Sequence, residues 1–427
     1  MEECKRISLL PGVTLNYVAS DQFKTDYLSI SLLRPLKREE AGLNSLLPEV
    51  LLQGCAQYPD MQSVAHRLDD LYGAGAGTMS RRWGEVQLVG LYGDCVSDRW
   101  TGGTPVLEPV IDMLGQLLLH PALENGAFCR DYVEAEKLNL IRAIQAQINN
   151  KRAYASRRMQ EIMFADEAYG INKAGTEETV SAITPESLFA HYQYILAHSD
   201  LQLFYLGSAS EERVTRAFRA ALEGLPRGET DPVGTVVVRR AETVRQATET
   251  MDVAQGQLVM GLRTDCVGGE PGSAALLLCN AVLGGTVSSK LFLKVREEMS
   301  LCYSVGSGLD RTKGVMTISA GIAFENEEKA RAAILQQLED CKNGAITAEE
   351  LENARSYLIS TLKMCQDSPA RQEELAISKA VGGAGTPYTV QIEQLREVTA
   401  EEVSAAARKL TLDTVYFLKG GDTDGAA

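Results

Sequence analysis

The clearest hydrophobic pattern near the start of the chain lies in residues 41–55, which read AGLNSLLPEVLLQGC. Apolar residues recur there with the three- and four-residue spacing of an amphipathic helix. These residues are Leu43, Leu46, Leu47, Val50 and Leu51. Pro48 has no backbone N–H to donate within a helix, so we expect it either to kink this helix or to start it anew.

Three pairs of segments resemble each other and occur in the same order along the chain. In the first pair, a tyrosine precedes a glycine by five residues and strand-like alternation follows. The second pair has the apolar spacing of a helix. The third begins with a threonine suited to cap a helix and continues through that helix into a strand. The pairs are residues 71–77 with 302–308, 133–144 with 351–362, and 183–207 with 398–420.

This ordered recurrence predicts a duplication. Residues 224–235 are rich in proline, glycine and charge, and we interpret them as a linker between two similar domains, 1–223 and 236–427. Within each domain the expected strands and helices occur in blocks rather than in strict alternation. That order is typical of an α+β architecture, in which helices pack on one face of a mostly antiparallel sheet.

Charge and composition narrow the classes of function. The formal net charge of −15 argues against the basic surface that nucleic acids or anionic membranes require. No apolar run reaches the roughly 18–20 residues of a membrane span, and the first residues do not resemble a secretory signal. The nine cysteines are odd in number and contain no CxxC pair, which favours a cytoplasmic protein without disulfides or a zinc knuckle.

Three further segments occur in order along the chain, at residues 42–59, 113–123 and 281–305. Together they resemble landmarks of the M16 family of metallopeptidases, which includes pitrilysin, insulysin and the mitochondrial processing peptidase. Residues 42–59 resemble the helix that carries the inverted zinc motif H-x-x-E-H. Residues 113–123 resemble the element upstream of the third zinc ligand. Residues 281–305 resemble a segment in which an arginine precedes a tyrosine by seven residues. The resemblance covers nearly the whole chain and implies two duplicated domains of the LuxS/MPP-like metallohydrolase fold.

The zinc motif itself is altered in this chain. The two histidine positions of the family fall on Ser45 and Glu49, and the general-base position falls on Pro48. The third ligand falls on or near Ala143, with Glu136 upstream on the same expected helix. Zinc catalysis of this type needs three protein ligands and an open position for water. We therefore expect no metal and no other cofactor in this chain.

Arg296 and Tyr303 keep the spacing of the family's arginine and tyrosine. The resemblance implies that they contact the substrate backbone and stabilise the tetrahedral intermediate, which suits a guanidinium and a phenol O–H. Gly284 and Gly285 are implied substrate contacts as well. Two other interpretations stay open, in which Arg296 is a solvated helical arginine and Tyr303 is a core residue like its counterpart Tyr72.

Residues 77–93 resemble the exposed strand on which the family's peptide substrates lie by adding a strand to the sheet. Met79 and Ser80 are possible substrate contacts on it. An ordinary edge strand protected by charged residues is an equal alternative. His191 and His198 lie seven residues apart, and we expect them to pack rather than to bind metal, because no acid or cysteine completes a ligand set.

Our main hypothesis is that this chain is the zinc-less subunit of a two-chain M16 peptidase. The resemblance implies a partner chain that carries H-x-x-E-H and zinc and hydrolyses a peptide, and bacterial paired insulinase-like proteins, one subfamily of which is named after elongation factor P modification, are similar. The rival hypothesis is a catalytically inactive peptide-binding or scaffold protein, with a homodimer possible in isolation. A third interpretation, a hydrolase that uses Glu49 and Glu136 on an unusual metal, is weakened by its shortage of ligands.

Overall fold

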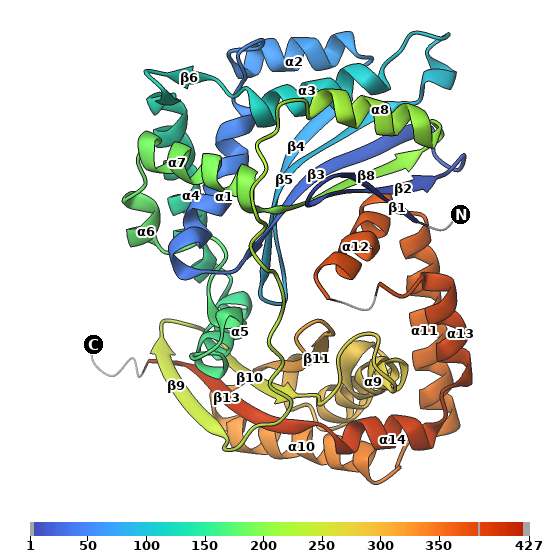
Figure 1. Ribbon diagram of the computed structural model, residues 1–427. Helices are drawn as coiled ribbons and strands as arrows, with labels where there is room; N and C mark the ends of the chain where they lie inside the picture. The colour runs from blue at the N-terminus through green and yellow to red at the C-terminus, as the bar shows by residue number, and fades with distance from the viewer. Residues whose placement is uncertain (1–3, 383–384, 422–427) are drawn as a thin grey trace. The chain divides into compact units, whose positions relative to one another are not determined.

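A computed structural model describes residues 4–382 and 385–421, which form two compact units (Figure 1). Within the described residues, unit 1 runs up to Gln145 and again from Ile171 to Gly234. Unit 2 comprises Ala146–Gly170 and the residues from Thr235 onward. In the part of the chain that the structure describes, no helix combines the length and the apolarity that crossing a membrane requires.

Unit 1 is built on a six-stranded sheet in the order β1-β2-β8-β3-β5-β4. Its neighbouring strands are antiparallel except for β2 and β8, which are parallel. The strands are β1 (Lys5–Leu10), β2 (Val13–Ala19), β3 (Thr25–Pro35), β4 (Gly75–Trp83), β5 (Val86–Val96) and β8 (Asp200–Gly207), with a small hairpin of β6 (Leu123–Glu124) and β7 (Ala127–Phe128). The helices are α1 (Arg38–Leu52), α2 (Met61–Asp70), α3 (Leu107–Leu119), α4 (Arg130–Ala146), α6 (Glu177–Ser181), α7 (Pro185–His198) and α8 (Glu211–Ala221).

The helices of unit 1 cover one face of this sheet. Leu28, Ile30 and Leu32 alternate along β3 and join one apolar core with residues of α1, α3, α7 and α8. In Figure 1, α3 and α8 lie side by side over the sheet, and they pack against each other. The period-two alternation of β3 therefore selects which face the helices bury.

Unit 2 is built on a five-stranded sheet in the order β11-β12-β10-β13-β9, in which only the β13–β9 pair is parallel. Its strands are β9 (Arg245–Met251), β10 (Gly256–Arg263), β11 (Cys302–Asp310), β12 (Val315–Ile322) and β13 (Thr411–Gly420). Its α-helices are α5 (Lys151–Met163), α9 (Ser273–Asn280), α10 (Glu327–Lys342), α11 (Ala348–Gln366), α12 (Pro369–Ala380), α13 (Tyr388–Glu397) and α14 (Ala400–Arg408). Two further turns, η4 (Ala281–Gly285) and η5 (Leu291–Glu298), are π-helical.

The two sheets share one topology, as the predicted duplication requires. Read from one edge, β4-β5-β3-β8-β2 of unit 1 matches β11-β12-β10-β13-β9 of unit 2, and β1 is an addition to unit 1. The single parallel pair falls at the same place in both sheets. Thr184 and Thr399, predicted as helix caps, form capping boxes at the starts of α7 and α14. The prediction of duplicated α+β domains with mostly antiparallel sheets is confirmed.

The division of the chain between the units differs from the predicted one. The chain passes from unit 1 to unit 2 between Gly234 and Thr235, at the end of the predicted linker, but residues 146–170 also belong to unit 2. Helix α5 in this segment is apolar at Ala155, Met159 and Met163, which recur every four residues and pack against Tyr416 and Leu418 of β13. The segment therefore covers the face of the unit 2 sheet opposite to its other helices.

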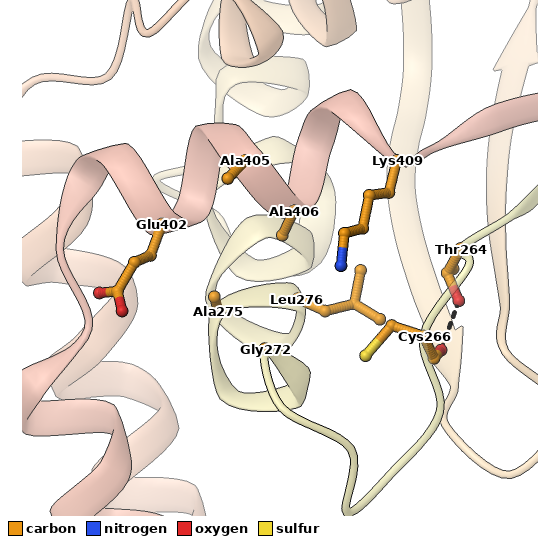
Figure 2. Close-up of a pocket in the computed structure, with 9 residues that line it drawn as sticks. All are labelled: Thr264, Cys266, Gly272, Ala275, Leu276, Glu402, Ala405, Ala406 and Lys409. Atoms are coloured by element: carbon orange, nitrogen blue, oxygen red, sulfur yellow. Dashed lines mark hydrogen bonds between the residues drawn. The ribbon is translucent and has the colours of Figure 1, made fainter.

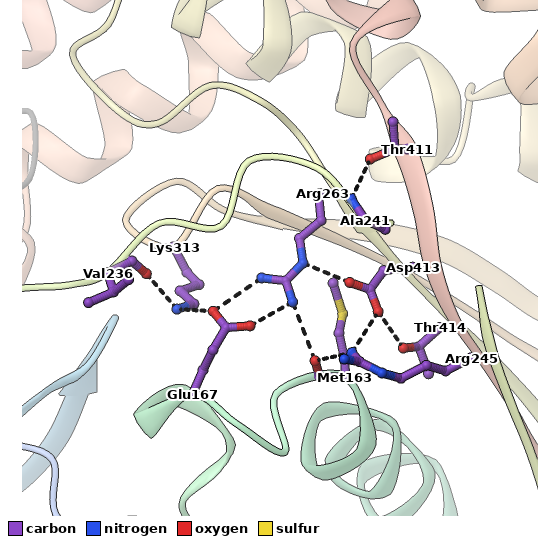
Figure 3. Close-up of polar contacts among 10 residues, drawn as sticks. All are labelled: Met163, Glu167, Val236, Ala241, Arg245, Arg263, Lys313, Thr411, Asp413 and Thr414. Carbon is purple, nitrogen blue, oxygen red and sulfur yellow. Dashed lines mark hydrogen bonds and ion pairs between the residues drawn. The ribbon is translucent and has the colours of Figure 1, made fainter. Parts of the chain in front are cut away.

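A buried ionic cluster fixes this segment to the sheet (Figure 3). Glu167, which follows α5, accepts from Arg263 of β10 at 2.7 Å and pairs with Lys313 at 2.7 Å. Asp413 of β13 accepts from the other side of the Arg263 guanidinium at 2.9 Å. Arg263 and Lys313 are almost fully buried, so each needs these partners to offset the loss of hydration. A Cβ at Gly261 would lie 2.4 Å from the sulfur of Met163, so glycine permits the close approach of α5.

Candidate functional site

The positions of the altered zinc motif all lie on α1. The helix begins at Arg38 and runs through Pro48 to Leu52. The expectation that Pro48 starts the helix anew is therefore wrong. The missing N–H of Pro48 removes one bond from the helix, and packing of its buried neighbours Leu46, Leu47 and Val50 compensates for that loss.

Ser45, at the first histidine position, is 7% exposed and is held by three partners. Its hydroxyl donates to the backbone carbonyl of Lys173 at 2.7 Å, lies 3.0 Å from the hydroxyl of Ser80, and accepts from Gln87 Nε2 at 3.2 Å. The Lys173 ammonium in turn donates to the backbone carbonyl of Ser80. A loop residue of this chain, Lys173, thus fills the space beside the first ligand position.

A line of buried amides connects this position to α7. Gln87 of β5 donates to the Lys173 carbonyl at 2.9 Å and accepts from Asn44 Nδ2 at 3.1 Å. Asn44 Oδ1 lies 2.7 Å from Nε2 of His191, which donates to it as a neutral ring. Burial, opposed by Glu40 and reinforced by Arg34, lowers the pKa of His191 to about 4. The polar side chains at this position are therefore paired with one another through hydrogen bonds.

The remaining carboxylates near α1 do not complete a zinc site. Glu49 accepts from Thr78 Oγ1 of β4 at 2.7 Å, and Glu136 of α4 accepts from Gln53 Nε2 at 2.8 Å. Ala143 is exposed and carries no donor atom. Across residues 4–382 and 385–421, no group of three or more histidine, cysteine, aspartate or glutamate side chains could hold a metal ion. A hydroxyl, a proline ring and separated carboxylates do not supply the three ligands that zinc requires.

Arg296 and Tyr303 come from different elements and line one cavity of about 320 Å³ in unit 2. Arg296 lies in the last turn of η5, and π-helical turns occur frequently at functional sites. Tyr303 lies in edge strand β11. Cys302 pairs with Ile322 and Ser304 pairs with Gly321, so Tyr303 is an extra, bulged residue. A bulge re-aims the side chain of the inserted residue, and here it directs the Tyr303 side chain outward.

Both side chains are accessible. Tyr303 is 69% exposed, and among the described residues its hydroxyl has no hydrogen-bond partner. The Arg296 side chain is 38% exposed, lies over the Phe292 ring at 4.5 Å and forms a 3.4 Å ion pair with the exposed Glu297. An exposed pair of this kind contributes little, so the guanidinium keeps donors for another ligand. The interpretation of Tyr303 as a core residue is therefore wrong, and its counterpart Tyr72 is also exposed, at 55%.

A cysteine beside this pair is chemically quiet. Cys302 lines the same cavity, and burial, opposed by Arg296, raises the pKa of its thiol to about 11. The thiol is therefore protonated at neutral pH and is a poor nucleophile. The chemistry that this cavity offers is hydrogen-bond donation by Arg296 and Tyr303.

The other predicted substrate contacts lie in both units, two glycines in unit 2 and two residues of β4 in unit 1. Gly284 and Gly285 end the π-helical turn η4, and a Cβ at Gly284 would lie 2.8 Å from the backbone nitrogen of Ser307 in β11. Met79 and Ser80 lie in β4, which is an edge strand of the unit 1 sheet. Met79 is buried and Ser80 is half-buried. Their role as substrate contacts stays a prediction.

Comparisons with known proteins show which family the chain resembles in sequence and in fold. A family model described as "Peptidase M16 inactive domain" matches residues 182–358. The chain is 30% identical over 420 residues to "Probable inactive metalloprotease YmfF" of Bacillus subtilis (strain 168), with 97% of each chain covered. A crystal structure of a conserved protein from Enterococcus faecalis V583 has a TM-score of 0.92 at 26% identity and covers 99% of this chain and 100% of that chain. A peptidase M16 inactive domain from Pseudomonas fluorescens has a TM-score of 0.78 at 17% identity over 100% of both chains, which shows the fold alone.

The fold and the altered motif define a metallopeptidase-like protein without the zinc ligand set. The chain belongs to the M16 peptidase family, as a member that lacks the zinc motif.

Sequence reasoning missed the residues that fill the altered site. Lys173, Gln87 and Asn44 lie in unremarkable surroundings in the sequence, and nothing in their local spacing predicts that they meet Ser45. Ser45 and Lys173 are 128 residues apart and become neighbours only through the fold. We expected His191 and His198 to pack rather than to bind metal; His198 Nδ1 lies 2.8 Å from the Glu229 carbonyl and its ring centroid lies 4.6 Å from that of Tyr194.

Proposed function

We propose that this chain is the non-catalytic subunit of a two-chain M16 peptidase. A partner chain with an intact H-x-x-E-H motif supplies zinc and the general base. This chain supplies Arg296 and Tyr303, which bind the peptide backbone and donate hydrogen bonds to the oxyanion that forms during hydrolysis.

The observation that carries this proposal is the shared, exposed cavity of Arg296 and Tyr303. Two donors from separate elements converge on about 320 Å³ of space, and neither is consumed by a strong internal partner among the described residues. The seven-residue spacing of Arg296 and Tyr303 does not by itself require this exposure. A structural arginine and tyrosine would be expected to bury their apolar parts and to pair their polar ends within the fold.

The contacts of α1 support the assignment of catalysis to another chain. Ser45 is bound to Lys173 and Ser80, and Glu49 is bound to Thr78. Water activation by these residues would need a base and a metal that the donor set does not provide.

The test is peptide cleavage by the co-purified pair of chains. Arg296→Ala and Tyr303→Phe are each expected to lower kcat/KM by roughly 10²-fold, the usual loss when one oxyanion donor is removed. Arg408→Ala and Tyr357→Phe are the matched controls, since they change an exposed arginine and an exposed tyrosine on α14 and α11. Unchanged kcat/KM in both test variants would contradict the role.

The rival function, a peptide-binding or scaffold protein, has a distinct outcome in the same experiment. The name of the Bacillus subtilis relative describes an inactive metalloprotease, which favours keeping this alternative. Peptide binding that depends on Arg296 and Tyr303, without cleavage by any complex of the chain, would favour the scaffold over the peptidase subunit.

A further inference from the structure

A second cavity lies within unit 2, away from the Arg296–Tyr303 pair in sequence and in lining residues. It has a volume of about 140 Å³ and is enclosed by the loop after β10, the start of α9 and the end of α14 (Figure 2). Its walls include Cys266, Ala275, Leu276, Ala405, Ala406 and Lys409.

The interior of this cavity is apolar because its polar neighbours are already engaged. Thr264 Oγ1 donates to the Cys266 carbonyl at 2.7 Å, and the Glu402 carboxylate accepts from the backbone of Thr399 at 2.8 Å. Burial and the Glu270 carboxylate raise the pKa of the Cys266 thiol, so the thiol is neutral and acts as a small apolar group. In Figure 2 the Glu402 side chain points away from the other polar groups of the cavity.

Among the described residues that line this cavity, only Lys409 has a charged group that is not already engaged by a hydrogen bond or ion pair. Its side chain reaches over the cavity, and its ammonium group points toward Cys266 and Leu276 in Figure 2. Within the described residues, the Lys409 ammonium forms no hydrogen bond or ion pair, whereas the neighbouring Arg408 guanidinium is bound to Glu401 and to the Lys342 carbonyl. The Glu270 carboxylate attracts Lys409 electrostatically, but it is already paired with Arg239 at 2.5 Å. An ammonium group over an apolar cavity, with no carboxylate at ion-pair distance among the described residues, is complementary to a ligand with one negative charge and an apolar body.

We propose that this cavity binds a small monocarboxylic acid with a compact apolar body. The carboxylate pairs with Lys409, and the body fills the space between Leu276 and the alanines of α9 and α14. The volume sets the size, because a cavity of about 150 Å³ accepts a molecule as large as benzene. A single cation and a neighbouring Glu402 disfavour a dianion such as a phosphate ester, which needs several donors.

The test uses benzoate and hexanoate as probes, with benzamide and hexanamide as neutral analogues of the same shape, titrated into the full chain by calorimetry. The carboxylates are expected to bind at least about tenfold more tightly than the amides, as a charge-assisted hydrogen bond implies. Lys409→Met should remove this preference. Ala405→Phe should prevent binding of all four compounds, because the ring fills the cavity.

The control is Arg408→Met, which removes one positive charge from the same helix end outside the cavity and should leave binding unchanged. Equal affinity for benzoate and benzamide would overturn the proposal, as would equal losses in the Lys409 and Arg408 variants or no binding at all. Lys409 is exposed, so its variant is expected to keep the fold, and thermal unfolding of each variant verifies this. No peptidase assay enters the test, so its outcome is independent of the proposed function.

Discussion

His191 couples the packing of α1 to protonation. Its ring donates to Asn44 at 2.7 Å, and Asn44 donates to Gln87 in turn, so a neutral imidazole is part of the buried line beside Ser45. Burial lowers the pKa of His191 to about 4, below the ordinary value near 6.5. The unfolded chain therefore binds a proton more readily at this residue than the folded chain does.

Stability should consequently depend on pH through His191. The pKa is lower in the folded state, so the contribution is fully present above pH 6.5 and is lost as pH falls toward about 4; it amounts to about 3 kcal/mol. His191→Gln keeps a donor for Asn44 without titrating, and it should flatten this part of the pH dependence of the free energy of unfolding. Urea unfolding at several pH values measures this, with His198→Gln as control. Identical slopes in both variants would contradict the prediction.

At the residue scale, the sequence predicts which zinc ligands are missing better than it predicts which contacts the residues in their place make. A serine, a proline and an alanine cannot ligate zinc tightly wherever they lie, so the types at Ser45, Pro48 and Ala143 decide the question alone. What took the place of the metal could not be predicted, because Lys173 reaches Ser45 through a contact between segments far apart in the chain.

At the scale of secondary-structure elements, a side chain of the same chain occupies a backbone carbonyl of edge strand β4. The Lys173 ammonium donates to the Ser80 carbonyl, and burial together with Arg82 and Arg81 lowers the pKa of Lys173. A lysine at an edge strand hinders pairing with another strand. The sequence predicted an edge strand here and left open whether it binds peptide or is protected by charge. The position of Lys173 favours protection at Ser80.

Removal of this lysine should therefore loosen β4. Lys173→Met keeps the length of the side chain but leaves the Ser80 carbonyl without its donor, which should cost about 1–2 kcal/mol of unfolding free energy. Hydrogen exchange of the β4 amides should increase relative to β5. Lys363→Met on exposed α11 is the control, and equal effects of the two variants on β4 would refute a local role.

For the whole molecule, the duplication was predictable and the path of the chain was not. Three ordered repeats and two capping threonines lie in the sequence itself, so the two-sheet architecture follows from local pattern. Residues 146–170 also have a clear helical pattern, but the pattern does not say which sheet the helix covers. That choice depends on Tyr416, Leu418 and the ionic cluster around Arg263, which are all far from this segment in the sequence.

Unit 2 should accordingly require this segment. Glu167→Gln leaves Arg263 and Lys313 buried with one fewer anion, which should cost about 3–5 kcal/mol of unfolding free energy. Glu161→Gln in the same segment changes a half-exposed pair with Arg158 and should cost less than about 1 kcal/mol. Chemical unfolding followed by near-ultraviolet circular dichroism measures both. Similar small losses in the two variants would show that the cluster does not hold the segment.

The same effect should appear in acid. Burial raises the pKa of Glu167, but hydrogen bonds from Arg263 and Lys313 outweigh it and leave the pKa below its ordinary value of 4.5. Its contribution to stability is therefore present above pH 4.5 and is lost as pH falls below that value.

The path of residues 146–170 also has a consequence for synthesis on the ribosome. Met159, Met163 and Phe164 emerge early, but Tyr416 and Leu418, against which they pack, follow roughly 250 residues later, or about 13–50 s at 5–20 residues per second. During that interval the nascent chain exposes the apolar face of α5 without the β13 residues that cover part of it in the folded unit. We therefore expect the folding yield of the nascent chain to depend on how long this apolar face stays uncovered during synthesis.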